Sequence, residues 1–138
     1  MKMNWLKFSS FKNNGSIRQL TDWLAVIPKN DLVWSVFDFN GIGIPPNNMS
    51  MDDFEQLTRS MHCGFIMEWE ELKKFANSIT QTFDCSIVGA RSKDDISKVI
   101  LEKENFDSCE VVLRALDSTE WLIGARDHTV IEKWGALS

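Results

Sequence analysis

The chain has 138 residues, of which 43% are hydrophobic and 25% charged, as expected of one soluble globular domain spanning residues 1–138. No apolar stretch reaches the ~20 residues that cross a bilayer, and residues 1–16 contain neither the apolar core nor the cleavage site of a secretory signal, so we expect a cytoplasmic protein. The net charge of −5 combines a basic segment at residues 1–30 with an acidic remainder, which disfavours binding to nucleic acid and favours a basic protein partner.

A helix, a strand and a loop are predicted in the first third of the chain. Ser16 and Gln19 have the spacing of a capping box, and apolar residues follow at helical intervals, which predicts a helix over residues 16–28. The segment DLVWSVFDF, residues 31–39, is apolar on both sides, as in a strand that is covered on both faces. The glycines and prolines of NGIGIPPNN predict a loop over residues 40–48.

Two amphipathic helices with acidic first turns are predicted next, over residues 50–64 and 68–83. The first has Ser50 as its N-cap, and the second begins with the acidic sequence EWEEL. Their buried stripes are Met51, Phe54, Leu57 and Met61 in the first helix and Trp69, Leu72, Ala76, Ile79 and Phe83 in the second. The helix dipole alone explains acids at these positions, and the alternative is that they also form a partner-binding surface.

The rest of the chain is predicted to contain three strands and two helices. The strands are residues 85–90, 108–116 and 120–125, and the helices are residues 92–106 and 127–135. The first of these helices should bury Ile96, Val99 and Ile100, and the second should be capped by Asp127. The sequence DSTE between the last two strands is too short for anything but a hairpin turn.

The order of elements indicates the α+β class, with a mixed sheet of four or five strands that helices cover. Helical connections between the early strands can support parallel pairing, whereas the last two strands form an antiparallel hairpin that is followed by a short helix. Residues 5–11 are the candidate for the fifth strand, although their pattern is weak. Tryptophans that belong to apolar stripes should meet in one core: Trp23, Trp34, Trp69 and Trp121.

The chain offers few groups for catalysis, cofactor binding or metal binding. It contains no nucleophile-elbow sequence and no phosphate-binding glycine loop. His62 and His128 are expected on the surface. Cys63, Cys85 and Cys109 are widely spaced, and they lack the paired ligands of a zinc site and the even number of a disulfide framework. We therefore expect no enzyme activity, no cofactor and no metal.

Asp38 differs from the other acidic residues because it interrupts an otherwise apolar strand. A buried carboxylate needs a hydrogen-bond or charge partner, and its pKa is open to perturbation. The first expectation is a structural hydrogen bond. An exposed position at a sheet edge and a functional carboxylate are the alternatives.

Two segments, VVLRALDSTEWLIGARDHTVIEKW and MEWEELKKFANSITQTFDCSIVGA, resemble bacterial immunity proteins of contact-dependent growth inhibition and related polymorphic toxin systems. The resemblance implies a small, acidic, cytosolic and non-enzymatic protein that binds one cognate toxin domain, commonly a basic nuclease. Asp117, Ser118, Trp121 and Asp127 match the shared pattern and look like fold residues: a hairpin turn, a core aromatic residue and a helix cap. Toxin-contacting positions vary among such proteins, so the resemblance assigns none.

The acidic residues themselves lead to a candidate surface. If helices 50–64 and 68–83 pack side by side, as their short FIM connection suggests, their acids share one region of surface. We predict that this region contacts a basic toxin, and the partner-binding candidates are Asp52, Asp53, Glu55, Glu70 and Glu71. The alternative functions are another protein-interaction module or adaptor and, less favoured, a small-ligand protein or an enzyme.

Overall fold

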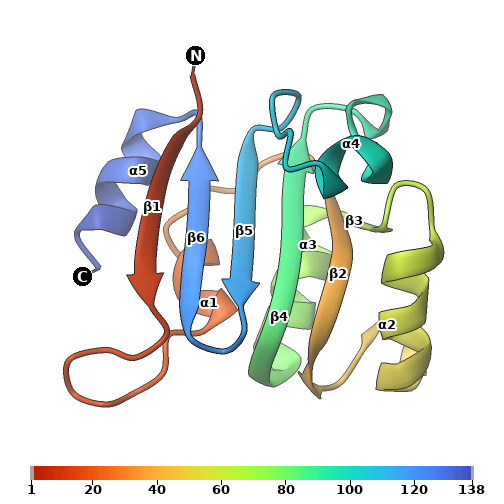
Figure 1. Ribbon diagram of the computed structural model, residues 1–138, viewed down its shortest axis with the longest axis horizontal. Helices are drawn as coiled ribbons and strands as arrows, with labels where there is room; N and C mark the ends of the chain where they lie inside the picture. Colours follow the sequence, from red (N-terminus) through yellow and green to blue (C-terminus); the bar gives the residue numbers. More distant parts are fainter. Residues whose placement is uncertain (1, 138) are drawn as a thin grey trace.

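The middle layer of the protein is an antiparallel sheet of six strands, shown in Figure 1, in a computed structural model that describes residues 2–137. The strands are β1 (Asn4–Ser9), β2 (Val33–Gly43), β3 (Phe65–Met67), β4 (Ile79–Ala90), β5 (Val111–Leu116) and β6 (Glu120–Ala125). Their order across the sheet is β1-β6-β5-β4-β2-β3, and every neighbouring pair is antiparallel. The helices are α1 (Leu20–Leu24), α2 (Met51–Ser60), α3 (Trp69–Ser78), α4 (Lys98–Glu102) and α5 (His128–Gly135), with 3-10 turns at Pro46–Asn48 and Lys93–Asp95.

Helices cover the two faces of the sheet unequally. The larger core lies on the face that α1, α3 and α5 cover, and it includes Trp23 and Trp134. α2 stands beside β2 and contributes Phe54 to the same core. The smaller core lies under the segment of residues 91–109, which contains α4 and its buried Leu101 and is turned toward the viewer in Figure 1. This α+β domain therefore has one face that is closed by helices and one that is only partly covered.

The expectation of parallel pairing among the early strands is wrong, and the sheet is antiparallel rather than mixed. The expected connection FIM, residues 65–67, is itself strand β3 and pairs with residues 34–36 of β2. Because β3 intervenes, α2 joins β2 to β3 and α3 joins β3 to β4. β3 and β4 run in the same direction, but they lie on either side of β2 and do not pair, so no parallel pair forms. The candidate strand at residues 5–11 is confirmed as β1, which pairs with β6.

The first helix is shorter than predicted, because its cap lies at Gln19 rather than at Ser16. A carboxylate oxygen of Asp22 accepts the backbone N–H of Gln19 at 2.8 Å, which is the reciprocal bond of a capping box. The residues before Gln19 are not helical, and Ile17 forms an isolated β-bridge with Phe11. The capping box was therefore expected one turn too early.

A long ribbon of β2 and β4 replaces the predicted end of one helix and part of a predicted loop. The helix that was expected to run to residue 83 ends at Ser78, and the next residues begin β4 and pair with residues 41–43 of β2. The sequence ITQTF is rich in β-branched and aromatic residues, which favours a strand. A Cβ at Gly41 would lie 2.5 Å from the carbonyl oxygen of Gln81, so this close approach of the two strands requires glycine.

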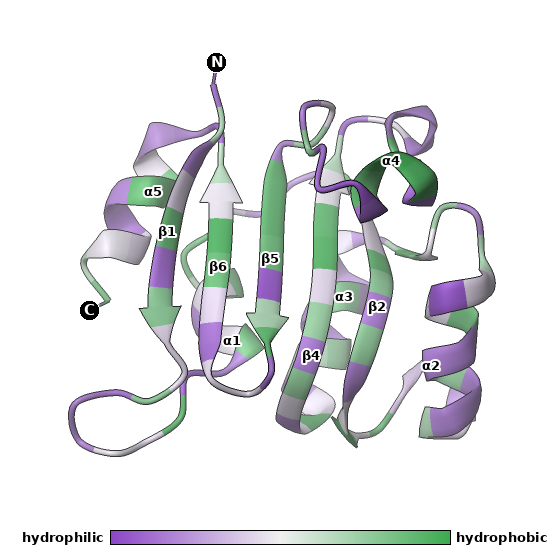
Figure 2. Cartoon of the chain, viewed as in Figure 1, coloured by the Kyte–Doolittle hydropathy of each residue, from purple (hydrophilic) through white to green (hydrophobic). Residues whose placement is uncertain are grey.

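The helix predicted over residues 92–106 is broken into a 3-10 turn and α4. Ser97, between them, has extended backbone angles, so the helical repeat starts again in a new orientation. Ile96 is buried as predicted, but Val99 is 57% exposed and Ile100 is also exposed, which contradicts their inward assignment. Figure 2 shows the result, a strongly hydrophobic α4 on the surface.

The C-terminal hairpin and helix agree with the sequence prediction. β5 and β6 are joined by a tight turn in which Asp117 and Ser118 have φ angles of 51° and 60°. Positive φ angles at both turn positions match the right-handed twist of the paired strands. Asp127 accepts the backbone N–H of Thr129 at 2.8 Å and caps α5 as predicted.

The tryptophans meet in the larger core as predicted, and all four are buried. The ring centroids of Trp23 and Trp121 are 5.9 Å apart, and those of Trp34 and Trp69 are 5.4 Å apart. Trp134 of α5 joins them, because its indole N–H donates to the carbonyl oxygen of Trp23 at 2.9 Å. Aromatic packing therefore ties α1, α3 and α5 to the strands.

Replacing Trp69 with alanine should lower the free energy of unfolding by ~3–5 kcal/mol, because the change leaves a cavity between α3 and β2. Urea unfolding followed by circular dichroism measures this loss. Trp5→Ala is the matched control, since Trp5 is 40% exposed, and it should cost clearly less. Equal losses in the two variants would contradict the placement of Trp69 in the core.

Candidate functional site

Asp52 and Asp53 lie on the exposed first turn of α2. The hydroxyl of Ser50 accepts the backbone N–H of Asp53 at 3.1 Å, so the cap of this helix uses the serine and not the two carboxylates. Neither carboxylate forms a hydrogen bond or an ion pair with another residue in the described chain. Both are therefore available to a partner.

The other three predicted partner-binding residues have bonds within the fold. Glu55 accepts the backbone N–H of Gly41 at 3.3 Å. Glu71 accepts the N–H at the start of its own helix at 3.1 Å and so completes the capping box of α3. Glu70 forms an ion pair of 3.9 Å with Lys73, and such exposed pairs contribute little to stability. Glu55 and Glu71 thus have structural partners that the sequence did not indicate.

Glu70 and Glu71 lie on different sides of α3, since neighbouring positions on a helix are about 100° apart. Glu71 lines a groove beside the loop of residues 44–48, whereas the partner of Glu70, Lys73, lines a depression between α3 and α1. α2 and α3 meet inside the protein through an aromatic pair with ring centroids 5.0 Å apart. The structure therefore brings Glu71 and the start of α2 to the same loop and leaves Glu70 outside this group.

The loop of residues 44–48 is held against α3 and leads directly into α2. The N–H of Ile44 donates to the carbonyl oxygen of Ser78 at 3.2 Å, and the hydroxyl of Ser78 donates to the carbonyl oxygen of Ile44 at 2.6 Å. Asn47 and Asn48 have φ angles of 59° and 58°, in the left-handed region that asparagine tolerates. A groove of about 270 Å³ lies between the loop and α3. Ile44 is nevertheless 70% exposed, the highest value among the exposed large apolar side chains of the described chain.

Asp38 lies on the opposite face of the sheet, at a β-bulge. In the ladder between β2 and β4, Val36 pairs with Ile87 and Asp38 pairs with Ser86, which leaves Phe37 as the extra residue. The bulge places Phe37 and Asp38 side by side on the face that α4 partly covers.

A hollow of about 410 Å³ opens above Asp38, between the sheet, α4 and the last turn of α2. This space is termed the Asp38 hollow. Its lining consists of Phe37, Asp38, Arg59, Ser86, Lys98, Leu101, Glu102, Glu104 and Arg114. Three basic and three acidic side chains therefore share one space, although they come from segments far apart in the sequence.

Two of the bases are already paired inside the hollow. Lys98 pairs with Glu102 at 3.7 Å. Its ammonium group also donates to the backbone carbonyl oxygen of Arg59, in the last turn of α2. Arg114 pairs with Glu104 at 3.2 Å, and its Nε–H donates to the hydroxyl of Ser86 at 3.3 Å. The side chains of Lys98 and Arg114 are 13% and 20% exposed, whereas Glu102 and Glu104 are 60% and 72% exposed, so the two acids meet the bases from the solvent side.

The carboxylate of Asp38 has no such partner. It is half-buried, and it forms no hydrogen bond or ion pair with a residue in the part of the chain that the structure describes. Burial raises its pKa above the usual range and the charge of Asp84 adds to this rise, while the three bases of the hollow act in the opposite direction. The expected structural hydrogen bond is not found, and the carboxylate opens into the hollow instead.

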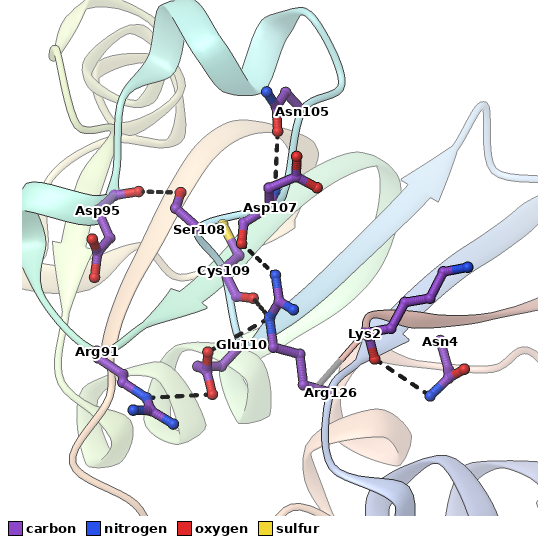
Figure 3. Close-up of polar contacts among 10 residues, drawn as sticks. All are labelled: Lys2, Asn4, Arg91, Asp95, Asn105, Asp107, Ser108, Cys109, Glu110 and Arg126. Carbon is purple, nitrogen blue, oxygen red and sulfur yellow. Dashed lines mark hydrogen bonds and ion pairs between the residues drawn. The ribbon is translucent and has the colours of Figure 1, made fainter.

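A polar network, drawn in Figure 3, connects both ends of the segment that contains α4 with Arg126, which directly follows β6. The Nε–H of Arg126 donates to the carbonyl oxygen of Cys109 at 2.7 Å, and the same guanidinium donates to the carbonyl oxygen of Asp107. Glu110 pairs with Arg126 at 3.6 Å and with Arg91 at 3.5 Å. The Arg126 bonds tie residues 107 and 109 to the end of β6, whereas the ion pair of Arg91 at the other end of the segment is exposed. The network therefore holds the segment that contains α4 mainly through its C-terminal end.

Replacing Arg126 with methionine should loosen α4 without unfolding the sheet, because two backbone carbonyls lose their donor. Amide hydrogen exchange in residues 98–102 should become about tenfold faster, as expected for a local opening. Lys7→Met removes an exposed ion pair on β1 and serves as the control, with exchange in α4 unchanged. Unchanged protection of α4 in Arg126→Met would show that the network does not hold this segment.

The two histidines lie on the surface as expected, and two of the three cysteines are buried. Cys85 and Cys109 are buried, and burial raises the pKa of the Cys109 thiol to about 11, so its thiolate is scarce at neutral pH. His62 and His128 are exposed. Within residues 2–137, no group of three or more His, Cys, Asp or Glu side chains is placed to hold a metal ion.

Comparisons of this chain with models of protein families, with curated proteins and with solved structures gave no match. Every helix within residues 2–137 is too short or too polar to span a bilayer. Two features of the chain itself are therefore the basis for a function: the loop of residues 44–48 with its neighbouring acids, and the Asp38 hollow.

Replacing Asp38 with asparagine should stabilise the fold near neutral pH. The folded state raises the pKa of this carboxyl, so ionisation of Asp38 lowers the stability of the fold. This penalty is absent below about pH 4, where the carboxyl is protonated, and it appears as the pH rises through the raised pKa. Asparagine cannot ionise, so the melting temperature should rise by ~1–3 °C at about pH 7 and stay unchanged at about pH 3.

Thermal unfolding at the two pH values measures this difference, with Asp94→Asn at an exposed position as the control. A lower melting temperature for Asp38→Asn at neutral pH would mean that the ionised carboxylate stabilises the fold through a partner, contrary to the geometry of the hollow.

Proposed function

We propose that this protein is an immunity protein of the contact-dependent growth inhibition type, which neutralises one toxin domain by stoichiometric binding in the cytoplasm. The observation that carries the proposal is a fixed and exposed apolar loop next to unpaired acids, with Ile44 in the loop and Asp52 and Asp53 at the start of α2. The resemblance of residues 67–90 and 111–134 to such proteins supports the same assignment.

The loop has the properties of a preorganised contact surface. Hydrogen bonds to Ser78 hold the backbone of Ile44 in place, so the loop loses little conformational freedom when it binds a partner. Exposed apolar patches with polar surroundings commonly mark sites of protein interaction. Ile42, two residues before Ile44 near the end of β2, is a second exposed apolar side chain, at 52%. An apolar centre with a charged rim is the usual arrangement of a protein–protein interface.

The acids beside the loop favour a basic partner. A nuclease domain carries lysines and arginines that hold the phosphates of its substrate. Asp52 and Asp53, which have no partner in the described chain, can form charge-assisted hydrogen bonds with such groups. Binding of this kind would cover the nucleic-acid site of the toxin, and the opposite charges would speed association.

The proposal predicts that a large secreted protein is encoded beside the gene, and the direct experiment is co-expression in bacteria of this protein with the C-terminal domain of that neighbour. Growth should be restored, and the two purified chains should form a one-to-one complex. Growth arrest in the presence of the folded protein would overturn the immunity function. Complex formation without protection would instead favour the alternative, an adaptor that uses the same surface.

The combined change Asp52→Asn and Asp53→Asn should slow association with the toxin domain about tenfold at low salt and less at high salt. The loss of two charges near the helix start should reduce stability by only ~0.3–1 kcal/mol each. Ile44→Ser should act differently, by speeding dissociation, because it removes apolar contact and no charge. Surface plasmon resonance separates the two rate constants.

The matched control combines Asp94→Asn with Glu132→Gln, which removes the same charge from exposed positions on other elements. It should leave the association rate near that of the unmodified protein. Equal slowing by both double variants would mean that the total charge of the protein, and not the surface beside the loop, attracts the partner.

A further inference from the structure

Two opposite charges in the Asp38 hollow lack partners within the fold. The guanidinium of Arg59 forms no hydrogen bond or ion pair with a residue in the described chain, and the same holds for the carboxylate of Asp38. The other four charged side chains of the hollow are paired with one another, two by two. Arg59 acts on Asp38 through space, and both groups line the same cavity.

The balance of charges in the hollow favours a ligand that carries both signs. Three basic and three acidic side chains line the space. A simple cation would be attracted by the acids and repelled by the bases, and a simple anion would meet the reverse. A small molecule with separated positive and negative groups can place each one beside its opposite, namely Asp38 and Arg59.

The state of Asp38 supports the same kind of ligand. A half-buried carboxylate without a donor disfavours its own ionisation, and burial accordingly raises its pKa. An ammonium group that donates to this carboxylate would return its pKa toward the usual range. The penalty that Asp38 imposes on the free protein would thus be relieved by binding.

The size and the apolar part of the lining narrow the ligand class further. The volume of about 410 Å³ falls in the range of ~300–1,000 Å³ that is typical of small-molecule sites. Phe37 and Leu101 give the hollow an apolar side, and both are buried. An aliphatic group can pack there while the charged end of the same molecule reaches Asp38 and Arg59.

We propose that the Asp38 hollow binds a free α-amino acid, with its ammonium group on Asp38, its carboxylate on Arg59 and an aliphatic side chain against Phe37 and Leu101. The hollow lies on the other face of the sheet from the loop of residues 44–48. Amino-acid binding is therefore a second activity, and it does not depend on the toxin binding proposed above.

Titration of the ¹⁵N-labelled protein with L-leucine, followed by nuclear magnetic resonance, tests the proposal. The amide signals of Asp38, Ser86 and Arg114 should shift and saturate with a dissociation constant of ~1 mM or lower. Two fragments of leucine separate its charges, since 4-methylpentanoate lacks the ammonium group and 3-methylbutylamine lacks the carboxylate. Each fragment should bind at least about tenfold more weakly than leucine.

Equal binding of leucine and 4-methylpentanoate would make the hollow an anion site, and equal binding of leucine and 3-methylbutylamine would make it a cation site. Either result would overturn the proposal. Absence of shifts with every free L-amino acid at about 20 mM would also overturn it, because the dissociation constant would then be too high for a binding function.

Substitutions in the hollow provide the second arm of the test. Asp38→Asn and Arg59→Gln should each weaken leucine binding at least about tenfold. Neither should unfold the protein, since asparagine removes a destabilising charge and Arg59 is exposed. Asp94→Asn and Lys93→Gln, which change the same charges outside the hollow, should bind leucine normally. Unchanged affinity in the two hollow variants would overturn the site, and their protection against the toxin should stay intact.

Discussion

The pairing of β2 with β4 is the constraint on which the rest of the structure depends. This ladder runs from residues 33 and 90 to residues 43 and 79, it joins the two longest strands of the sheet, and it contains three shifts of register. The shift at Phe37 turns Asp38 toward α4, and the last shift lies between Ile42 and Gly43, directly before the chain leaves the sheet for the loop of residues 44–48. Both candidate binding regions therefore adjoin irregularities in one ladder.

Strand β2 of this ladder contributes side chains to both faces of the sheet. Trp34 lies in the aromatic core on the closed face, and Asp38, four positions further along β2, lines the polar hollow on the other face. The closed face supplies the burial that stabilises the domain. The partly covered face can therefore hold an unpaired carboxylate, whose penalty is small beside the stability from the core. The aromatic core and the unpaired carboxylate thus lie on opposite sides of one strand.

Local signals in the sequence were sufficient for the C-terminal hairpin and for the helix capped by Asp127, because turns and caps depend on adjacent residues. The strand at residues 65–67 and the antiparallel order depend on partner strands, which local patterns do not contain. The end of α3 had a local signal in the β-branched residues of ITQTF, but the apolar residues Ile79 and Phe83 also fit the helical stripe. For the site, Asp38 was conspicuous as an acid in an apolar strand, but its neighbours Arg59 and Arg114 come from distant elements, so no spacing could reveal them. The acids at the start of α2 are exposed, as their positions in a first turn indicate, whereas the bond that occupies Glu71 could be seen only in the structure.

The position of β1 at one edge of the sheet affects how the chain can fold during its synthesis. Residues 4–9 are made early, yet their only neighbour in the described sheet is formed by residues 120–125. This strand has no partner strand until β6 has been made, whereas β2 and β4 can pair before that. Contacts between such distant residues form slowly because the intervening chain must first be brought together. Attachment of α5, which seats Trp134 against Trp23, belongs to the same late step, so the aromatic core is completed only when the two ends of the fold meet.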